Sequence, residues 1–367
     1  MHVRWVELVG FRNYASLSFA PDPHLNVLSG PNGSGKTSLL EGIHLLLTGR
    51  SFRTPRLVEC ISWDAGEASV SGEVAQGEQS RQIRLTLAAR NGAVEVGGAL
   101  CPWARAVTFA AADLALLTGA PSVRRAYLDE AAAKLVPAHR ETCRQYRLVL
   151  QQRGKLLERL AGRSDADRLL APWDEQVATL GSEIVHRRLR SLATLAQEAR
   201  DIWQVLAGHG AAAELIYAPA LAPGEDPAST RVRLLAALTA GRAKETLRGV
   251  TLVGPHRDDL VIRLGRADAR SAASRGEQRL LALTLRLAEA GTMRQRLGTP
   301  PVFLLDDLLS ELDRRVRERV LGWLATQGQV LFSTTDAVPG AGAVGTVWEV
   351  RQAEVEALER VGTRGAA

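Results

Sequence analysis

The sequence is poor in cysteine and contains no long apolar stretch. Its 367 residues include three cysteines, which are too few and too scattered for a disulfide framework or a zinc site. A reducing compartment therefore fits best. No stretch approaches the ~20 apolar residues that a membrane span needs, and the first residues lack the apolar core of a secretory signal. We therefore expect a soluble, cytoplasmic protein without a membrane partner.

The composition does not indicate a linker or a low-complexity protein. Glycine and proline, at 33 and 15 residues, are close to average usage. A content of 46% hydrophobic and 23% charged residues is ordinary for a globular protein. One domain per ~150 residues predicts about two domains.

Lysine is scarce, and almost all basic residues are arginine. The formal net charge is +6, which favours a polyanionic partner. Only four of the 46 basic residues are lysine, and an arginine-rich composition also follows from a GC-rich genome. The basic balance is therefore weak evidence for nucleic acid, and the position of Lys36 carries more weight.

The first third of the chain reads as strands around one helix. Residues 3–9 alternate apolar and charged side chains, as a half-buried strand does. An apolar run at 25–28 leads into a glycine-rich stretch, and a helix is predicted over 37–47, ending near Gly49. Residues 67–109 read as short strands, with turn signals at Asn91-Gly92 and Gly97-Gly98.

The middle of the chain has a helical period. Residues 137–208 predict two helices separated by a polar turn at 162–167. The second helix carries a heptad-like apolar seam formed by Leu192, Leu195, Ala199, Ile202 and Leu206. Residues 144–200 hold 11 basic and 7 acidic side chains. A solvated helical hairpin and an arm that touches DNA are both compatible with this pattern.

The last third returns to mixed elements. After a Pro/Gly-rich loop at 219–227, strands are predicted at 251–253 and 260–264, followed by a long apolar helix over 277–290. Two further apolar runs, at 302–305 and 330–333, predict buried strands.

The glycine-rich stretch matches a phosphate-binding loop. It reads Gly30, Pro31, Asn32, Gly33, Ser34, Gly35, Lys36 and Thr37, which fits G-x-x-x-x-G-K-[ST] between a predicted strand and a predicted helix. Glycines let successive backbone N–H groups converge on phosphates, and the helix N-terminus adds partial positive charge. In such a loop Lys36 reaches the β- and γ-phosphates and the Thr37 hydroxyl is a Mg²⁺ ligand. The motif predicts ATP and Mg²⁺ as cofactors.

Two carboxylates follow the predicted strand at 302–305. Asp306 and Asp307 are costly at a buried strand end unless a cation or hydrogen-bond donors satisfy them. We expect Asp306 to hold Mg²⁺ directly or through water, and Asp307 to orient or deprotonate the attacking water. Lys36, Asp306 and Asp307 are therefore the candidate catalytic residues, and Thr37 and Asp306 the candidate metal ligands.

The distance between these motifs indicates an insertion. Asp306 follows Lys36 by 270 residues, too far for a compact GTPase or a small kinase. Ahead of Asp306, Ser274-Arg275-Gly276-Glu277-Gln278 opens the predicted helix. The pentapeptide fits a capping box with Ser274 as N-cap. It also fits an ABC-type signature, whose serine and helix N-terminus bind the γ-phosphate held by another subunit, and its position ahead of Asp306 favours that interpretation.

At this point the chain resembles the RecF family, bacterial recombination mediators with an SMC/ABC-type ATPase head. The resemblance covers essentially the whole chain. It rests on family-specific stretches around the motifs above, at residues 10–14, 49–54, 109–129 and 254–260, of which Gly254-Pro255-His256-Arg257-Asp258-Asp259-Leu260 is close to diagnostic.

The resemblance implies an α/β fold: an ABC/SMC-like P-loop ATPase head, with mixed and parallel sheet and flanking helices, plus an inserted helical lobe. The expected domains are 1–130 and 246–367 for the two parts of the head and 131–245 for the lobe. The resemblance also implies that Ser274 and Gly276 contact the partner's ATP and that Asp313 occupies the D-loop position.

The family binds ATP, dimerises around it and associates with double-stranded and gapped DNA. It works with RecO and RecR to load the RecA recombinase at gaps in recombinational repair, replication maintenance and the response to DNA damage. The resemblance thus implies an ATP-dependent homodimer, a nucleoid-associated cytoplasmic location and RecR- and RecO-type partners.

Several positions depart from the ABC pattern. Arg275 and Glu277 replace a glycine and a glutamine of the transporter signature, Asp307 replaces a longer glutamate, and Thr334-Thr335 occupies the position of the switch histidine. An acid near a γ-phosphate is unfavourable unless it faces away, as helix capping would arrange. These departures predict a slow, DNA-stimulated ATPase, in which the signal comes from ATP binding more than from ATP hydrolysis.

Three other protein classes share some of these motifs. A transporter-type ABC subunit would carry its signature roughly a hundred residues after the loop, whereas an SMC-like structural protein would carry a coiled coil of hundreds of residues. A small-molecule kinase would respond to a metabolite and not to DNA. Two local alternatives also stay open: a structural turn or a sensing role for His256-Arg257, and pairing of Arg124-Arg125 with Asp129 and Glu130 or a position near phosphates.

Overall fold

The structure is a computed structural model that describes residues 1–90, 93–160, 163, 165–208, 210–307, 312–335 and 345–361. The chain divides into two compact units, each containing segments that are distant in sequence. Unit 1 consists of Met1–Asp113, Ile202–His209 and Arg275–Ala367, and unit 2 of Leu114–Asp201 and Gly210–Ser274. The expected lobe bounds of 131–245 stay a prediction: unit 2 also contains residues on both sides of that range, and Ile202–His209 within it belong to unit 1.

A six-stranded sheet forms the centre of unit 1. Its order is β14-β13-β3-β12-β11-β7, and neighbouring strands from β13 to β7 run parallel, whereas β14 is antiparallel to β13. The buried strands are continuous apolar runs, as parallel strands covered on both faces are. The strands are β3 (Leu25–Ser29), β7 (Ala106–Phe109), β11 (Val302–Leu305), β12 (Val330–Thr334), β13 (Gly345–Arg351) and β14 (Glu354–Val361).

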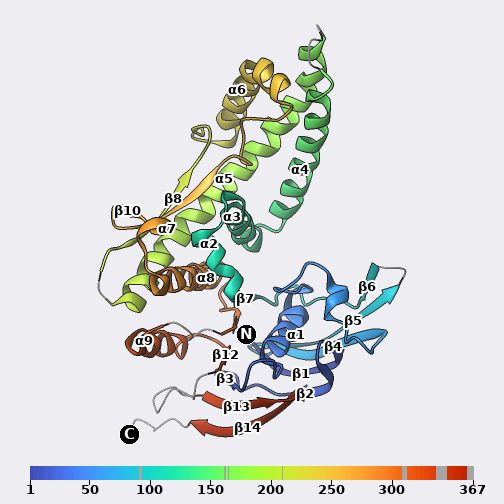
Figure 1. Cartoon of the computed structure of the whole chain (residues 1–367), viewed down its shortest axis with the longest axis vertical. Helices are drawn as coiled ribbons and strands as arrows, with labels where there is room; N and C mark the ends of the chain where they lie inside the picture. The colour runs from blue at the N-terminus through green and yellow to red at the C-terminus, as the bar shows by residue number, and fades with distance from the viewer. Residues whose placement is uncertain are drawn as a thin grey trace. The chain divides into compact units, whose positions relative to one another are not determined.

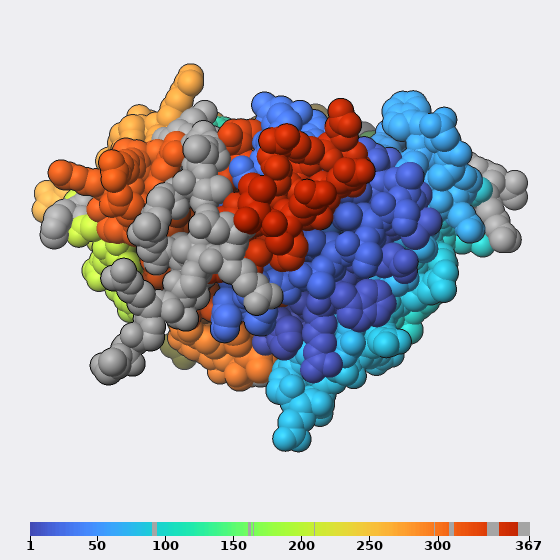
Figure 2. All heavy atoms as spheres, turned by 90° about the horizontal axis from the view of Figure 1, so that it is seen from below, coloured from blue at the N-terminus to red at the C-terminus, as the bar shows by residue number. Residues whose placement is uncertain are grey.

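A second, antiparallel sheet of unit 1 has the order β2-β1-β4-β5-β6. Its strands are β1 (His2–Phe11), β2 (Tyr14–Phe19), β4 (Glu67–Gln76), β5 (Gln79–Arg90) and β6 (Ala93–Gly97). The predicted turn at Asn91-Gly92 lies outside the described residues. One face of this sheet and helix α1 (Lys36–Thr48) share a hydrophobic core, which explains the alternating burial along β4. Figure 2 shows the C-terminal strands of unit 1 in red against its N-terminal strands in blue.

Helices complete unit 1. They are α1, a 3₁₀ turn η1 (Leu57–Cys60), α8 (Arg275–Leu297) and α9 (Arg314–Leu324). Helix α1 ends where the sequence predicts, because Gly49 adopts the left-handed conformation with φ 70° and its N–H bonds back to Leu45. The predicted mixed and parallel sheet with flanking helices is confirmed by these elements (Figure 1).

Unit 2 is mainly helical. After η2 (Ala111–Leu114) and α2 (Ala115–Thr118), its elements are α3 (Pro121–Leu135), α4 (Ala138–Leu157), most of α5 (Ala166–Ala207), β8 (Ala213–Ala218), α6 (Pro227–Arg248), β9 (Asp259–Leu264), β10 (Ala267–Asp268) and α7 (Ala269–Ala272). Strands β10, β9 and β8 form a small antiparallel sheet. The predicted pair of helices is confirmed as α4 and α5, and all five residues of the predicted seam are buried.

The strand predicted at 251–253 is wrong. This segment has no regular structure, because the Thr251 carbonyl accepts hydrogen bonds from the side chains of His256 and Arg257 instead of a neighbouring strand. Among the described residues, no helix is both long and apolar enough to span a membrane.

A fully buried ion cluster holds the helices of unit 2 together. Arg153 on α4 is wholly inaccessible to solvent and contacts Asp174 on α5 at 2.7 Å and Glu245 on α6 at 2.6 Å. Its third hydrogen bond goes to the Thr251 hydroxyl. The remaining oxygens are used as well, since Arg242 donates to Asp174 and the Leu252 N–H donates to Glu245. Such a cluster tolerates burial only when every charge has partners.

Candidate nucleotide-binding site

The loop between β3 and α1 forms one wall of the candidate site. At its end, Gly35 has φ 119° and directly precedes the first residue of α1. A Cβ atom at Gly35 would lie 2.6 Å from the Tyr14 hydroxyl oxygen and 2.9 Å from the Asn13 amide nitrogen. The Tyr14 hydroxyl donates to the Gly35 carbonyl at 3.1 Å. Only glycine therefore fits, both for its conformation and for the close approach of β2.

Lys36 is held by the loop itself. Its ammonium group donates to the carbonyls of Gly30 at 2.7 Å and Pro31 at 2.8 Å, so it lies across the loop. Burial lowers the pKa of Lys36, and the nearby charges of Asp306 and Asp307 oppose that shift. The lysine thus lies where an anion bound by the loop would contact it.

Ser34 supplies an unsatisfied polar atom inside the loop. Its side chain is buried, and its hydroxyl has no hydrogen-bond partner among the described residues. A buried hydroxyl without a partner costs free energy, and such groups in native proteins call for an explanation. A phosphate oxygen in the loop would supply the missing partner.

The loop and the end of strand β11 are joined by hydrogen bonds between side-chain oxygen atoms. The Thr37 hydroxyl lies 2.8 and 3.0 Å from the two Asp306 carboxylate oxygens, across 269 residues of sequence. Ser333, at the end of β12, donates to Asp306 at 2.7 Å. Hydroxyl and carboxylate oxygens are the donors that Mg²⁺ prefers. The residue set therefore fits a magnesium ion beside a bound phosphate.

Asp307 is fixed in an unusual backbone conformation. Its φ is 49°, a left-handed value that non-glycine residues rarely adopt. Its N–H donates to the Ser333 hydroxyl at 2.8 Å, and its carbonyl accepts from the Arg279 guanidinium on α8. The side chain is half exposed and lies 3.7 Å from that guanidinium. The two backbone contacts hold the strained residue in place.

These residues line one cleft of about 550 Å³ in unit 1. Its volume is in the range that holds small-molecule ligands and cofactors. The cleft combines cations and carboxylates: Lys36, Arg12 and Arg53 on one hand, and Asp306, Asp307 and Glu59 on the other. All residues of the predicted loop from Asn32 to Thr37 lie on it, whereas Gly30 and Pro31 contact it through Lys36.

Glu41 is a residue that sequence reasoning missed. It is fully buried on α1 and pairs with Arg12 through two hydrogen bonds of 2.8 and 2.6 Å. Ser51 donates to the same carboxylate, and Arg53 lies 3.3 Å away. Burial opposes ionisation, but the hydrogen bonds from Arg12 and Ser51 outweigh it and lower the pKa of Glu41.

Glu41 therefore holds two arginines that line the cleft, Arg12 and Arg53, in position. Arg12 is itself in a left-handed conformation, with φ 53°. The sequence signal was available: Glu41 is a single acid within an apolar helix, and it is followed by the arginine-containing stretch 49–54. A buried acid in such a helix requires a cationic partner.

The other predicted site residues lie outside this cleft, and their roles stay predictions. Ser274 is exposed and immediately precedes α8, with Gly276 in the first turn of that helix. Asp313 accepts from the Val316 N–H at 2.9 Å and thereby caps α9. Ser310 and Glu311, which lie between Asp307 and Asp313 in the sequence, are outside the described residues. Thr335, at the switch position, lines the cleft.

The stretch at 254–260 has a structural explanation within unit 2. His256 lies 2.9 Å from the Tyr146 hydroxyl, and burial lowers its pKa to about 4. Asp258 accepts from the Ala220 N–H at 2.7 Å. Asp259 pairs with Arg124 through two hydrogen bonds of 2.8 Å. Pairing of Arg124 with Asp129 and Glu130 is therefore wrong, because its partner comes from β9, 135 residues away.

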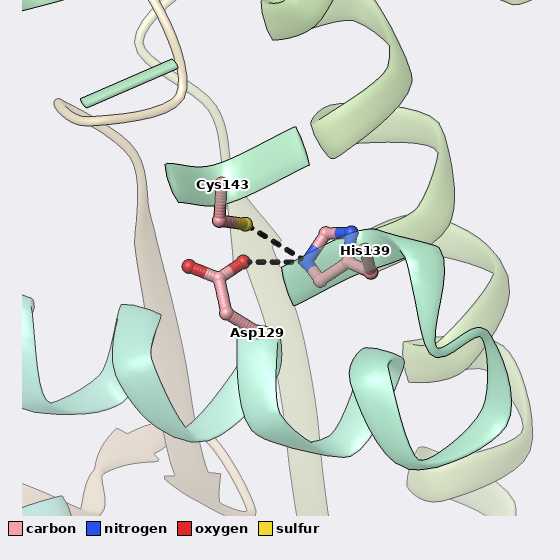
Figure 3. Close-up of side chains that lie close together, drawn as sticks. All are labelled: Asp129, His139 and Cys143. Atoms are coloured by element: carbon pink, nitrogen blue, oxygen red, sulfur yellow. Dashed lines mark hydrogen bonds and ion pairs between the residues drawn. The ribbon is translucent and has the colours of Figure 1, made fainter. Parts of the chain in front are cut away.

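A second group of potential metal ligands lies in unit 2. Asp129, His139 and Cys143 bring their ligand atoms within 4.8 Å of one another, and the carboxylate and the thiol both face the same imidazole nitrogen (Figure 3). Both Asp129 oxygens, however, accept hydrogen bonds from Arg188, at 2.7 and 2.8 Å. A cation already neutralises this carboxylate, and we interpret the group as a polar contact between α3, α4 and α5.

Comparison with known proteins assigns the family. The DNA replication and repair protein RecF of Streptomyces avermitilis is 38% identical over an alignment of 376 positions, which covers 97% of this chain and 100% of that protein. RecF of Lactobacillus delbrueckii subsp. bulgaricus is 36% identical over 338 residues, covering 89% of each. The chain belongs to the RecF family of DNA replication and repair proteins. A family model described as an AAA domain also matches residues 6–165.

Solved structures agree with this RecF assignment. A structure of the recombination mediator protein RecF-ATP in the RecFOR pathway has a TM-score of 0.83 and 26% identity, and it covers 98% of both chains. An Smc head bound to the C-winged helix domain of ScpA has a TM-score of 0.55 at 17% identity, covering 98% of this chain and 97% of the other, and shows a common fold alone. The expected RecF- and SMC-like head is confirmed.

Proposed function

We propose that this RecF family member binds ATP with Mg²⁺ in the cleft of unit 1 and uses it to control DNA binding. The observation that carries the proposal is the pairing of Thr37 with Asp306 beside the unpartnered Ser34 hydroxyl. The loop would hold the phosphates through Lys36 and its backbone N–H groups, and Thr37 and Asp306 would hold the metal. The bound ion would supply charge neutralisation for phosphoryl chemistry.

Two copies would enclose two nucleotides. Ser274 and Gly276 at the exposed start of α8 would contact the γ-phosphate held by the other copy, with Asp313 nearby, and the positive end of the helix dipole would favour that anion. Nucleotide would then join the copies and switch their affinity for double-stranded and gapped DNA. RecR- and RecO-type mediators, and through them the RecA recombinase, would be the partners of this nucleoid-associated cytoplasmic complex.

Hydrolysis would be slow. Asp307 would orient the attacking water, but Arg279 lies 3.7 Å from its carboxylate and competes with water for it. Thr335 lines the cleft at the switch position, and a threonine hydroxyl does not accept a proton as an imidazole does. DNA would stimulate turnover by favouring the paired state. Nucleotide binding, more than turnover, would therefore carry the signal.

Light scattering on a sizing column tests the proposal. Wild type is expected to run as a dimer with Mg²⁺-ATP or a non-hydrolysable analogue, and Lys36→Met as a single chain because it loses nucleotide. Ser274→Arg is expected to bind nucleotide and yet stay single, whereas Ser16→Arg, an exposed serine on β2, serves as the matched control. Dimerisation of Ser274→Arg at the wild-type level would reject capping in trans.

DNA binding is measured on the same proteins. Affinity for a fluorescent gapped duplex should rise with ATP for wild type and not for Lys36→Met. It should fall steeply with salt, since phosphate contacts dominate such binding. A wild-type protein that stays single with saturating nucleotide and DNA would contradict the proposed function.

A further inference from the structure

Trp63 is an exposed aromatic residue beside the phosphate-binding loop. It is the only one of the seven tryptophans whose side chain is exposed; the other six are buried or half-buried. Trp63 is also the most exposed large apolar side chain in the described residues, and it lines the same cleft as Lys36 and Thr37. A fully exposed indole within a ligand cleft is available for a ligand to cover.

The backbone that carries Trp63 is firmly held. Ser62 and Ala65 form a turn, with the Ala65 N–H donating to the Ser62 carbonyl at 3.0 Å. The Ser62 N–H donates to the Gly10 carbonyl at 2.8 Å, and its hydroxyl donates to the Arg12 carbonyl at 2.6 Å. Trp63 is thus anchored to the end of β1, although its own ring is not packed. A fixed backbone with an open ring is what a stacking surface requires.

We propose that Trp63 is the stacking platform for the nucleobase of the nucleotide whose phosphates the Gly30–Thr37 loop holds. The proposal rests on the proposed function, because the phosphates define where the base lies. Trp63 and the loop line the same cleft, so the base of a nucleotide anchored there by its phosphates would be within the cavity that Trp63 borders. Bases and indole rings stack through their π-faces, with little dependence on which base is present.

A second copy of the chain is the alternative occupant of this side chain. Two observations favour the base: Trp63 belongs to the phosphate cleft itself, and its turn is anchored through Arg12, which lines that cleft too. Stacking also explains why an aromatic residue lines a cleft whose other side chains are mostly charged or polar and suit phosphates. The prediction is that Trp63 contributes to affinity for nucleotides but not for the phosphate chain alone.

Calorimetric titration of the full chain with Mg²⁺-ATP and with magnesium tripolyphosphate tests this inference. Trp63→Ala is expected to weaken ATP binding at least about fivefold, the lower end for loss of a base–aromatic stack. Its affinity for tripolyphosphate should equal that of wild type. Trp63→Phe should restore ATP binding to within about twofold. Leu358→Ala, which removes an exposed apolar side chain of unit 1 outside the cleft, is the control.

The outcomes separate this inference from the proposed function. If Trp63→Ala binds ATP like wild type while Lys36→Met does not bind it, the platform is wrong and the nucleotide site stands. An equal loss for ATP and tripolyphosphate would also overturn the platform, because the residue would then act on the shape of the cleft. Unchanged ATP affinity with lost dimerisation would assign Trp63 to the second copy. Failure of wild type to bind ATP would instead reject the proposed function.

Discussion

The cleft of unit 1 and the ion cluster of unit 2 both contain buried polar and charged side chains, but they differ in how completely those side chains are hydrogen-bonded. Around Arg153, three fully buried charges satisfy one another and the neighbouring Thr251 hydroxyl. In the cleft, the buried Ser34 hydroxyl has no partner in the part of the chain that the structure describes, and the described hydrogen bonds of Lys36 go only to loop carbonyls. A complete network stabilises a fold, whereas an incomplete one in a cleft is ready for a ligand.

Backbone strain follows the same division. Arg12 and Asp307, both on the cleft, have left-handed φ values of 53° and 49°. Among the described residues of unit 2, by contrast, no non-glycine residue has a positive φ. Strain of this kind persists only where surrounding contacts over-determine it, and it concentrates at functional sites. Gln352 and Ala353, the other two described non-glycine residues with a positive φ, form the turn between β13 and β14, so only Arg12 and Asp307 connect this conformation with the cleft.

The largest expected effect comes from the buried cluster. Arg153→Met leaves Asp174 and Glu245 without their shared cation and should lower the free energy of unfolding by about 3–5 kcal/mol. Denaturant titration measures it. Arg144→Met is the control on the same helix, since its pair with Glu141 is exposed and should contribute little. Equal stability of the two variants would mean that the buried cluster contributes no more to stability than an exposed ion pair does.

A pH series should show the next largest effect. Although burial opposes it, hydrogen bonds from Arg188 and His139 lower the pKa of Asp129 from 3.8 to about 2. A carboxylate with a lowered folded pKa stabilises the fold above its unfolded pKa, and this stability is lost as pH falls from about 4 to 2. The stability advantage of wild type over Asp129→Asn should therefore shrink by about 2 kcal/mol in that window.

Unfolding curves between pH 5 and pH 2 measure this change for both proteins. Comparing wild type with the variant cancels the titration of the other carboxylates. A stability difference that stays constant across the window would mean that Arg188 and His139 do not hold Asp129 in its charged form.

The smallest expected effect is a substitution in the cleft that should stabilise the protein, whereas Arg153→Met should destabilise it. Ser34→Ala removes a buried hydroxyl without a partner and should raise the free energy of unfolding by about 1 kcal/mol. It should weaken ATP binding at the same time. Ser62→Ala, which loses the bond to the Arg12 carbonyl, should lower stability by about 1 kcal/mol. If Ser34→Ala instead destabilises the ligand-free protein, the cleft is not poised for a ligand.

Contiguous patterns were predictable, and distant pairings were not. The loop at Gly30–Thr37, the end of α1 at Gly49 and the seam of α5 were all predicted, because each depends on residues close together in sequence. Asp306 was predicted from its position at a strand end, although its Thr37 partner is 269 residues away. The strand at 251–253 failed because side chains took the backbone groups that a neighbouring strand would use.

Ser333 and Arg279 had no local sequence signal, and the lone acid Glu41 in an apolar helix indicated a buried cation but not which arginine supplies it. Each gains its role from a partner brought close by the fold: Arg12 for Glu41, and Asp306 or Asp307 for the other two. The same reason explains the wrong pairing of Arg124, whose nearest acids in sequence are not its nearest acids in space.

By itself the sequence specified the phosphate loop, the strand that ends in two carboxylates and the helical seam, because backbone geometry and burial period are local properties. Only the tertiary structure decided which buried polar groups have all their hydrogen-bond partners and which lack one that a ligand could supply. That distinction depends on contacts between segments that are separate in sequence, from 21 to 98 residues apart around Arg153 and 269 residues apart between Thr37 and Asp306.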